Sequence, residues 1–354
     1  MKVLLVTNDF PPKPGGIQQY LGGWVRNFDG EVRVLAPKDD GVVDGVVRGR
    51  SKWMLPTPRV RRWIEREIVA FEPDIVLFGA PMPLAHLGPR LRRHTGVPYA
   101  VLCYGAEVTV PASIPLYRQL VAWPLRRADV VLALSRYTAR RVERLIQRPV
   151  AAVGAGIGER FKPGDRPEGD VIGCVSRFVP RKGQARVLDA VALLREEGRD
   201  VSALLVGTGR DEKRLRRLAK RLGVPTRFEV GVPYEQLPDM YRQMTVFAMP
   251  SRSRWFGLDV EGLGLVYLEA SACGVPVITG ASGGAPEAVD PGVTGFVTDT
   301  YDGLLDALRL LVSDREQARE MGRNGVAWVA SQYSWEVVTK RFSDAFAEVI
   351  DRPR

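Results

Sequence analysis

The sequence is poor in the features that mark membrane spans, secretion signals and disulfide frameworks. No apolar run approaches the roughly twenty residues that a helix needs to span a bilayer. The first apolar run, Val3–Val6, meets a polar turn too early for a signal peptide, so it predicts the first strand of the fold. The three cysteines are odd in number and far apart, which predicts free thiols in a reducing cytoplasm: Cys103, Cys174 and Cys273.

Motifs for metal and dinucleotide chemistry are missing as well. The acidic pair Asp39-Asp40 is isolated in a loop, where solvation is expected, and the sequence supports no metal site. No G-x-G-x-x-G fingerprint is present, which argues against an NAD-dependent enzyme. The chain has no internal repeat and no low-complexity tract, and its 45% hydrophobic and 26% charged residues are typical of a globular protein.

Positive charge is in excess. The chain carries 51 Lys and Arg against 41 Asp and Glu, which gives a net charge of +10. Such a balance indicates a polyanionic partner (nucleic acid, an anionic membrane or phosphorylated substrates) or only an Arg-rich solvated surface. No recognised nucleic-acid-binding module and no interleaving of aromatic and basic residues occurs, so nucleic acid is not an expected partner.

Short apolar runs alternate with amphipathic helical stretches along the whole chain. Most runs lack polar alternation, as parallel strands buried on both faces do, so the pattern predicts an α/β fold with two doubly wound sheets. A cluster of glycines and prolines at Val153–Arg166 predicts a hinge between domains at 1–160 and 161–332, with a last helix at about 333–354. The expected strands are 3–6, 32–35, 74–78, 99–103, 129–134, 171–176, 201–207, 227–230, 246–249 and 275–279.

A glycine pair stands between the first expected strand and the first expected helix. The strand runs through Asp9 into a loop that ends at Gly15-Gly16, where a helical pattern begins. Unpaired amides at a helix start carry positive partial charge, which suits an anion. The missing Cβ atoms allow a phosphate or sugar to approach the backbone. The alternative is that the pair serves only the turn.

A basic loop follows the first expected strand of the second domain. Arg177 comes just after the strand's carboxyl end, where α/β proteins bind ligands, and Lys182 precedes Gly183 as the next helix begins. Two fixed cations in this place can neutralise a leaving diphosphate. A basic surface loop is the alternative, but a second glycine loop, Val206–Gly209, favours a binding role.

Two glutamates, Glu261 and Glu269, are eight residues apart, and the glycine-containing loop between them leads into a helix. Amides near Gly262–Val266 can bind phosphate oxygens at that helix start. Carboxylates suit vicinal diols because they accept paired hydrogen bonds, so one glutamate can bind a sugar and the other a ribose. A surface helix with two solvated glutamates is the alternative.

These motifs together resemble the retaining glycosyltransferases of family four. Glu261-x7-Glu269 with Gly274-x-Pro276 is similar to that family's E-x7-E signature, and Ser176–Gln184 is similar to its donor-phosphate motif. Thr7–Gln18 resembles its acceptor-side loop, and with Leu258–Gly264 the segments look most like actinobacterial mannosyltransferases of phosphatidylinositol mannosides. The resemblance covers nearly the whole chain. It implies a GT-B fold, in which two Rossmann-like domains face each other across a cleft and the last helix packs back on the first domain.

Carried over by position, the resemblance assigns a role to each motif. Arg177 and Lys182 would bind the donor diphosphate and, with Glu261 on the transferred sugar, form the catalytic set. Glu269 would bind the ribose, while Asp9, Gly15 and Tyr104 would contact the acceptor or the sugar. Such enzymes retain the anomeric configuration by same-face attack and need no metal cofactor. The implied donor-binding residues are Gly16, Arg177, Lys182, Val230, Glu261, Gly262, Leu263, Gly264, Leu265 and Glu269.

One position departs from the family pattern. The family usually carries a histidine in a His-Gly-x-Glu stretch, and Tyr104 holds that place in Tyr104-Gly105-Ala106-Glu107. A tyrosine can still donate a hydrogen bond to a sugar hydroxyl, but it does not titrate near neutral pH. The substitution therefore bears on the rate of transfer and on which sugar and acceptor are used.

The segment Pro58–Phe71 predicts a basic amphipathic helix. Its expected membrane contacts are Arg59, Arg61, Arg62, Trp63 and Arg66, because such a helix can lie on anionic lipid. A helix packed on the core, with a solvated basic face, is the alternative. The resemblance favours membrane binding, since related lipid-modifying enzymes dock through a basic helix of the first domain.

The implied function is that of a cytoplasmic hexosyltransferase, peripheral at the inner face of the cell membrane. It would move mannose from GDP-mannose to a phosphatidylinositol-mannoside-type lipid, and it would be a monomer or homodimer. The expected partners are the nucleotide sugar and an anionic phospholipid or glycolipid acceptor. Alternatives are a transferase that uses a UDP-sugar and another acceptor, a sugar-nucleotide epimerase, and a non-catalytic sugar-nucleotide-binding protein. Closure of the domains on donor binding is expected.

Overall fold

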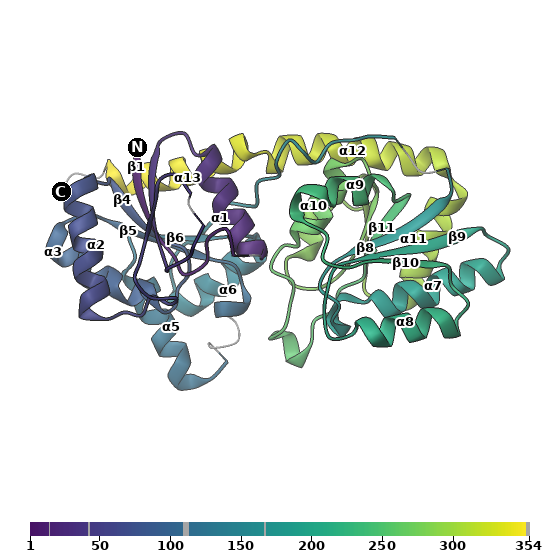
Figure 1. The fold of residues 1–354 in the computed structure, drawn as a ribbon, viewed down its shortest axis with the longest axis horizontal. Helices are drawn as coiled ribbons and strands as arrows, with labels where there is room; N and C mark the ends of the chain where they lie inside the picture. The colour runs from purple at the N-terminus through teal and green to yellow at the C-terminus, as the bar shows by residue number, and fades with distance from the viewer. Residues whose placement is uncertain (14, 42, 109–112, 166–167, 352–354) are drawn as a thin grey trace. The chain divides into compact units, whose positions relative to one another are not determined.

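The computed structural model describes residues 1–13, 15–41, 43–108, 113–165 and 168–351 (Figure 1). The chain divides into two compact units: an N-terminal unit, Met1–Gly156 with Trp335–Arg354, and a C-terminal unit, Ile157–Ser334. The sequence predicts the breaks near 160 and 332. They fall at 156 and 334 because Ile157 donates its N–H to Tyr333 O at 2.8 Å, which ties both crossing segments to the C-terminal unit. Arg166 and Pro167, at the end of the expected hinge, lie outside the described residues, as do the last three residues of the expected final helix.

In the described part of the N-terminal unit, seven parallel strands form one sheet in the order β3-β2-β1-β4-β5-β6-β7. The central strands β4 and β5 are buried along their whole length, which explains their unbroken apolar sequences. The strands are β1 (Lys2–Val6), β2 (Glu31–Ala36), β3 (Val46–Arg48), β4 (Ile75–Phe78), β5 (Tyr99–Cys103), β6 (Val130–Ala133) and β7 (Ala151–Ala152). The helices are α1 (Gly16–Asn27), α2 (Pro58–Phe71), η1 (Leu84–Leu87), α3 (Gly88–Thr95), α5 (Pro115–Arg127), α6 (Arg136–Ile146) and α13 (Trp335–Ile350).

The last helix belongs to the N-terminal unit. The buried ring of Trp24 on α1 lies 5.2 Å from that of Phe342 on α13, and Tyr20 lies 5.8 Å from Trp335. Burial of these aromatic side chains holds α13 against α1, although more than three hundred residues separate them along the chain. The last helix thus packs on α1 and clusters with the N-terminal unit.

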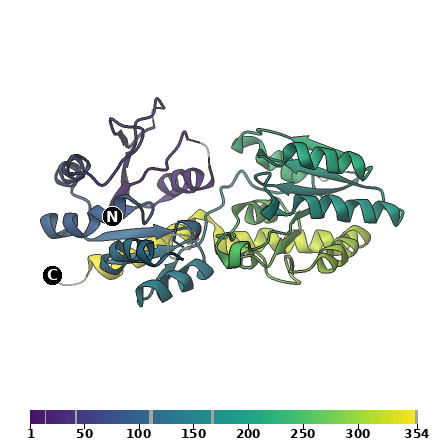
Figure 2. The same cartoon turned by 90° about the horizontal axis from the view of Figure 1, so that it is seen from below.

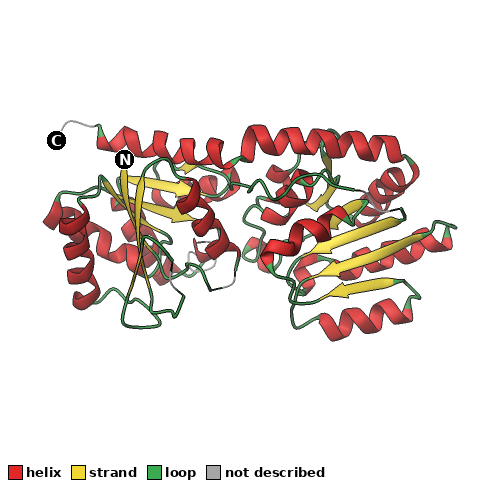
Figure 3. Ribbon diagram, turned by 45° about the horizontal axis from the view of Figure 1, so that its top comes forward, coloured by secondary structure: helices red, strands yellow, loops and turns green. Residues whose placement is uncertain are grey.

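The C-terminal unit has a second parallel sheet, in the order β10-β9-β8-β11-β12-β13. Figure 2 shows helices on both faces of each sheet, and Figure 3 shows strands of the C-terminal unit side by side and pointing the same way. The strands are β8 (Asp170–Val175), β9 (Val201–Val206), β10 (Thr226–Glu229), β11 (Val246–Met249), β12 (Val277–Gly280) and β13 (Gly295–Thr298). The helices are η2 (Pro180–Lys182), α7 (Gln184–Glu196), α8 (Glu212–Arg221), η3 (Tyr234–Gln236), α9 (Leu237–Arg242), η4 (Trp255–Gly257), α10 (Leu265–Ala272), η5 (Ala285–Ala288), α11 (Tyr301–Ser313) and α12 (Arg315–Tyr333).

Two doubly wound parallel sheets are thus present, as predicted, and all ten expected strands form. The strands that the sequence analysis missed, β3, β7 and β13, lie at sheet edges. Edge strands are short or partly exposed, so their sequences lack the long apolar runs on which the prediction depends.

Candidate functional site

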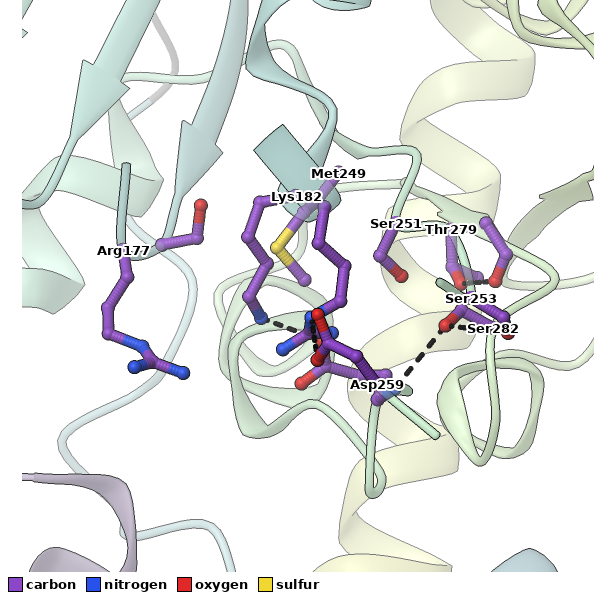
Figure 4. A network of polar contacts seen from close by, with 12 residues as sticks. Arg177, Lys182, Met249, Ser251, Ser253, Asp259, Thr279 and Ser282 are labelled. Carbon is purple, nitrogen blue, oxygen red and sulfur yellow. Dashed lines mark hydrogen bonds and ion pairs between the residues drawn. The ribbon is translucent and has the colours of Figure 1, made fainter. Parts of the chain in front are cut away.

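The candidate site lies at the carboxyl edge of the sheet in the C-terminal unit. Arg177 follows the end of β8, Ser251 the end of β11, and Ser282 the end of β12. In parallel α/β sheets this edge is where ligands bind, because the loops that follow the strands converge there. Figure 4 shows these side chains from close by.

Four charged side chains form a compact group at this edge, the Glu261 cluster: Arg181, Lys182, Asp259 and Glu261. Lys182 Nζ and Arg181 Nη1 each lie 2.7 Å from Glu261 Oε2, and Arg181 Nε lies 2.9 Å from Asp259 Oδ1. Both cations are buried. A buried cation needs such a partner, so the cluster holds the basic loop and the glutamate loop together.

Glu261 is held as a carboxylate. Burial acts to raise the pKa of Glu261, but the positive charges of Lys182 and Arg181 outweigh it, and the net pKa lies below its ordinary value. At neutral pH this side chain therefore acts only as a hydrogen-bond acceptor. Both cations contact Oε2, so the cluster does not depend on Oε1 for its ion pairs.

The loop after β12 supports the backbone of Glu261. The Glu261 N–H donates to Ser282 Oγ at 3.3 Å, and the Gly284 N–H donates to the Glu261 carbonyl at 2.8 Å. Gly283 adopts a φ of +60°, and a Cβ on it would lie 2.1 Å from the Glu261 carbonyl oxygen. Only glycine allows the two loops to approach this closely.

The start of α10 comes directly after Glu261. Gly264 is its N-cap in the left-handed conformation, with φ 84°, and no side chain caps the helix. The first turn, with Leu265 and Val266, is partly exposed, while Leu263 is buried. Backbone amides rather than side chains are therefore what Gly262–Leu265 can offer to an anion, at the positive end of the helix.

Glu269 has a different environment. It is 2% exposed, and its carboxylate accepts hydrogen bonds from Tyr241 Oη at 2.7 Å and Tyr234 Oη at 3.1 Å. Burial raises the pKa of Glu269 from 4.5 to about 7, against the effect of the two tyrosines. The alternative of two solvated glutamates on a surface helix is wrong, because Glu269 and its neighbours on α10 are buried inside the unit.

The remaining predicted donor residues of this unit lie at the same sheet edge but outside the cluster. Arg177 is exposed, and no ion pair joins it to the cluster within the described part of the chain (Figure 4). Val230 follows β10 and is exposed, as a residue that packs on a nucleobase would be before binding. Arg177 is thus a cation that a ligand can pair without breaking an existing ion pair.

In the N-terminal unit, the predicted glycine loop leads into α1 as expected. Gly15 is the N-cap, again without a side-chain cap, and Gly16 is the first helical residue. Asp9 Oδ1 accepts a hydrogen bond from Gln18 Nε2 at 2.8 Å and lies 3.6 Å from Lys13 Nζ. The amides at the start of α1 and the Asp9 carboxylate therefore lie in one loop.

Tyr104, at the end of β5, is buried with an orphaned hydroxyl. Its Oη has no hydrogen-bond partner among the residues that the structure describes, and its ring lies 6.0 Å from that of Tyr20. The neighbouring Glu107 accepts the N–H groups of Tyr104 and Gly105, and burial raises the pKa of Glu107. A buried hydroxyl without a partner is costly, so a ligand that supplies one would be favoured here.

Helix α2 uses its apolar face for the core. Ile64, Ile68 and Phe71 are buried, and Trp63 packs against the same core while its Nε1 lies 3.3 Å from Glu67 Oε1. Arg61 pairs with Glu65 at 2.9 Å. Of the five predicted membrane contacts, Arg59, Arg62 and Arg66 are the exposed ones, and they line a shallow surface hollow. Helix α2 therefore offers a partner the charge of these arginines together with the side chain of Val69, which is 76% exposed.

Several residues of the site were not predicted. Arg181 stands beside the predicted Lys182, so its charge is visible in the sequence, but its burial and its bond to Asp259 are not. Tyr234 and Tyr241, which hold Glu269, and Ser282, which holds Glu261, are far from their partners in the chain. The glycine turn that begins at Ser282 is visible in the sequence, but no sequence signal identified the two tyrosines.

Two further predictions concern cysteines and metals. The cysteines are buried free thiols, as expected. Among the described residues, no group of three or more His, Cys, Asp or Glu is arranged to hold a metal ion. None of the described helices has both the length and the apolar character needed to cross a membrane.

Family models match both units. Residues 14–157 match Glycosyltransferase Family 4, and residues 158–328 match Glycosyl transferases group 1. In fold, the chain is similar to sucrose-phosphate synthase from Thermosynechococcus elongatus, with a TM-score of 0.81, 19% identity and 99% of each chain covered. It is also similar to the HepE protein of Anabaena in complex with UDP and glucose, with a TM-score of 0.77, 20% identity and coverage of 98% and 100%.

Curated relatives align with nearly the whole chain. The GDP-mannose-dependent alpha-(1-6)-phosphatidylinositol monomannoside mannosyltransferase of Mycolicibacterium smegmatis is 39% identical, with 97% of each chain covered. The GDP-mannose-dependent monoacylated alpha-(1-6)-phosphatidylinositol monomannoside mannosyltransferase of Corynebacterium glutamicum is 36% identical over the same shares. Together with the two family models, this identity over the full length shows that the chain belongs to glycosyltransferase family 4 and has its GT-B fold.

Proposed function

We propose that this protein transfers mannose from GDP-mannose to a phosphatidylinositol-mannoside-type lipid, with retention of the anomeric configuration. The observation that carries the proposal is the Glu261 cluster at the carboxyl edge of a parallel sheet, in a chain 39% identical to a GDP-mannose-dependent mannosyltransferase of such a lipid. The donor is a substrate, and no further cofactor is proposed.

The donor diphosphate has three groups available to it. Arg177 is an exposed cation, Lys182 is a buried one, and the first turn of α10 presents backbone amides. Lys182 Nζ has three hydrogen-bond donors, so it can bind a phosphate oxygen while it keeps its 2.7 Å contact with Glu261. The two cations stabilise the negative charge that develops on the leaving nucleotide, a role that a divalent cation plays in other transferases.

The two glutamates divide the sugars of the donor. Glu261, which is ionised, accepts hydrogen bonds from hydroxyls of the transferred mannose. Glu269 accepts a hydrogen bond from a ribose hydroxyl. For this, the Tyr234 hydroxyl either leaves Glu269 Oε1 or shares that oxygen with the ribose. Val230, after β10, flanks the nucleobase. The acceptor hydroxyl attacks from the face that the nucleotide leaves, and a phosphate oxygen of the leaving group takes its proton.

The N-terminal unit supplies the acceptor side. The Tyr104 hydroxyl, which has no partner among the described residues, donates a hydrogen bond to a sugar hydroxyl. This bond replaces the one to water that the hydroxyl loses on burial. Asp9 accepts from a hydroxyl of the acceptor, and Gly15 and Gly16 let the sugar or diphosphate approach the start of α1. Arg59, Arg62 and Arg66 on α2 attract the anionic inner face of the cell membrane, where the lipid acceptor lies.

Nucleotide binding tests the donor assignment. The thermal midpoint is measured with GDP, UDP, ADP and dTDP and their common sugars, since a ligand that binds only the folded state raises it. We expect a shift with GDP and GDP-mannose, its loss in Lys182→Ala, and mannosyl transfer to a phosphatidylinositol monomannoside. The matched control Lys340→Ala removes an exposed lysine of α13 and should keep the shift. A shift with UDP-sugars alone would overturn the mannosyl assignment, and no shift with any nucleotide would overturn the enzyme assignment.

A further inference from the structure

The start of α5 exposes several large apolar side chains in the described part of the N-terminal unit. Every residue from 113 to 120 is exposed, and burial begins only at Val121. Leu116 is 73% exposed and Leu120 is 43% exposed, and Ile114, Tyr117 and Trp123 are exposed beside them. Figure 1 shows α5 at the lower edge of the N-terminal unit, with its first turns extending beyond the unit's other helices. Adjacent exposed apolar side chains of this size mark an interaction surface.

The charges around this surface have one sign. From Val108 to Ala128 the sequence contains no Asp or Glu, while Arg118, Arg126 and Arg127 carry positive charge. The Arg127 guanidinium lies 4.8 Å from the ring centre of Trp123, one turn back along the helix. Arg118 thus lies within the apolar tip, and beyond the tip come a tryptophan and then two arginines toward the body of the unit. This is the order of side chains in a segment that enters the interface of an anionic bilayer.

The tip has the right depth for an interface. About nine residues separate Ile114 from Trp123, so the apolar part of the helix is about 14 Å long. Interfacial helices bury apolar side chains about 5–10 Å into the boundary between headgroups and acyl chains. The exposed apolar side chains of the tip can therefore reach the boundary with the acyl chains, while Trp123, Arg126 and Arg127 stay among the headgroups.

Helix α2 offers less apolar surface than the start of α5. Its apolar face packs on the core through Ile64, Ile68 and Phe71, and among its large apolar side chains Val69, at 76% exposed, is the one left beside the arginines. Electrostatic attraction alone is weak at physiological salt, and stable binding of a protein to a membrane surface takes a second contribution.

We propose that the first turns of α5, through Leu116, Tyr117 and Leu120, insert into the anionic lipid surface that holds the acceptor. The proposal rests on the proposed lipid acceptor, since an enzyme that acts on a lipid must reach the bilayer surface. Burial of these apolar side chains in the bilayer would hold the N-terminal unit, which carries Tyr104 and the start of α1, at the membrane surface.

Vesicle binding of the full chain tests the proposal. Flotation uses vesicles of phosphatidylcholine with and without phosphatidylglycerol, in the absence of donor. We expect binding to the anionic vesicles, and we expect the double variant Leu116→Gln, Leu120→Gln to lower the partition constant about tenfold or more, because two leucine side chains no longer leave water. The matched control Leu310→Gln changes a leucine of α11 that is 39% exposed, and it should bind like the unchanged protein. Equal binding of the double variant, or no binding of the unchanged protein, would overturn the proposal.

A labelled cysteine reports insertion directly. The native cysteines are buried, so a polarity-sensitive dye will react with Leu116→Cys in preference to them. We expect a blue shift of this dye on anionic vesicles and none for Leu310→Cys. A protein that floats without a shift at position 116 docks through another surface, which would also overturn the proposal. The GDP-mannose shift is measured without vesicles, so failure of α5 insertion and failure of the donor assignment are distinguished.

Discussion

The raised pKa of Glu269 makes the stability of the protein depend on pH in a defined direction. The folded state keeps this carboxyl protonated up to about pH 7, whereas its ordinary pKa is 4.5. Below 4.5 both states are protonated and the group has no effect. As pH rises from 4.5 to about 7, the unfolded state loses its proton first, so the free energy of unfolding falls. Above about pH 7 the free energy of unfolding has fallen by the full amount that Glu269 causes. The rise in its pKa from 4.5 to about 7 corresponds to about 3 kcal/mol.

Glu269→Gln removes the ionisation and keeps the shape. The amide oxygen can accept the hydrogen bond of Tyr241, and the amide nitrogen can donate to the Tyr234 oxygen. We therefore expect the variant to match the unchanged protein near about pH 4 and to exceed it by about 3 kcal/mol near about pH 8.

The free energy of unfolding is measured by urea titration of both proteins across this pH range. The difference between them at each pH is the quantity of interest, since other groups titrate in both proteins alike. Glu235→Gln is the matched control, because it makes the same chemical change at a side chain that is 68% exposed. Parallel pH profiles for Glu269→Gln and the unchanged protein would refute the reasoning, because Glu269 would then be ionised in the folded state.

Two further predictions concern the glycine behind Glu261 and the orphaned hydroxyl. Gly283→Ala should weaken GDP-mannose binding and lower the thermal midpoint, because its Cβ would lie 2.1 Å from the Glu261 carbonyl oxygen. Gly292→Ala is the control, because Gly292 also has a positive φ of +81° but a Cβ there would meet no atom within 4 Å. The control should lose only the backbone strain energy of about 1 kcal/mol. Equal effects of the two variants on binding would contradict the contact. Tyr104→Phe should raise the free energy of unfolding by about 1 kcal/mol, because it removes a buried hydroxyl without a partner, and should lower the rate of transfer to the lipid. A less stable but fully active variant would show that the hydroxyl serves the fold alone.

The fold could be predicted from the sequence because a strand that is buried on both faces has an unbroken run of apolar residues. Runs such as Ile75–Phe78 and Tyr99–Cys103 are apolar throughout, and they became central strands. The edge strand Gly295–Thr298 has no such signal, since it is only partly buried. Hydrophobic periodicity therefore locates the middle of a sheet better than its margins.

The site could be predicted only in part, because the contacts of its side chains depend on packing between segments that are distant in the sequence. The order of Arg177, Lys182, Glu261 and Glu269 along the chain is visible in the sequence and marks the family motif. The contact of Arg181 with Asp259 joins loops that follow different strands, and it appears only when β8 and β11 pair in the sheet. The apolar tip of α5 was missed for a related reason: its residues have the composition of a core helix, and only their exposure distinguishes them.

The paired glutamates show how one residue type can take two electrostatic states within eight positions. Glu261 lies in a loop where two buried cations reach the same carboxylate oxygen, so its pKa is lowered despite burial. Glu269 lies in α10, where Tyr234 and Tyr241 donate to it, and these neutral donors do not offset the loss of water. Ribose hydroxyls that donate to Glu269 favour its ionised form, so donor binding should release a proton near neutral pH and tighten about tenfold between about pH 6 and about pH 8. The two carboxylates thus differ in pKa because two buried cations contact Glu261, whereas tyrosine hydroxyls contact Glu269.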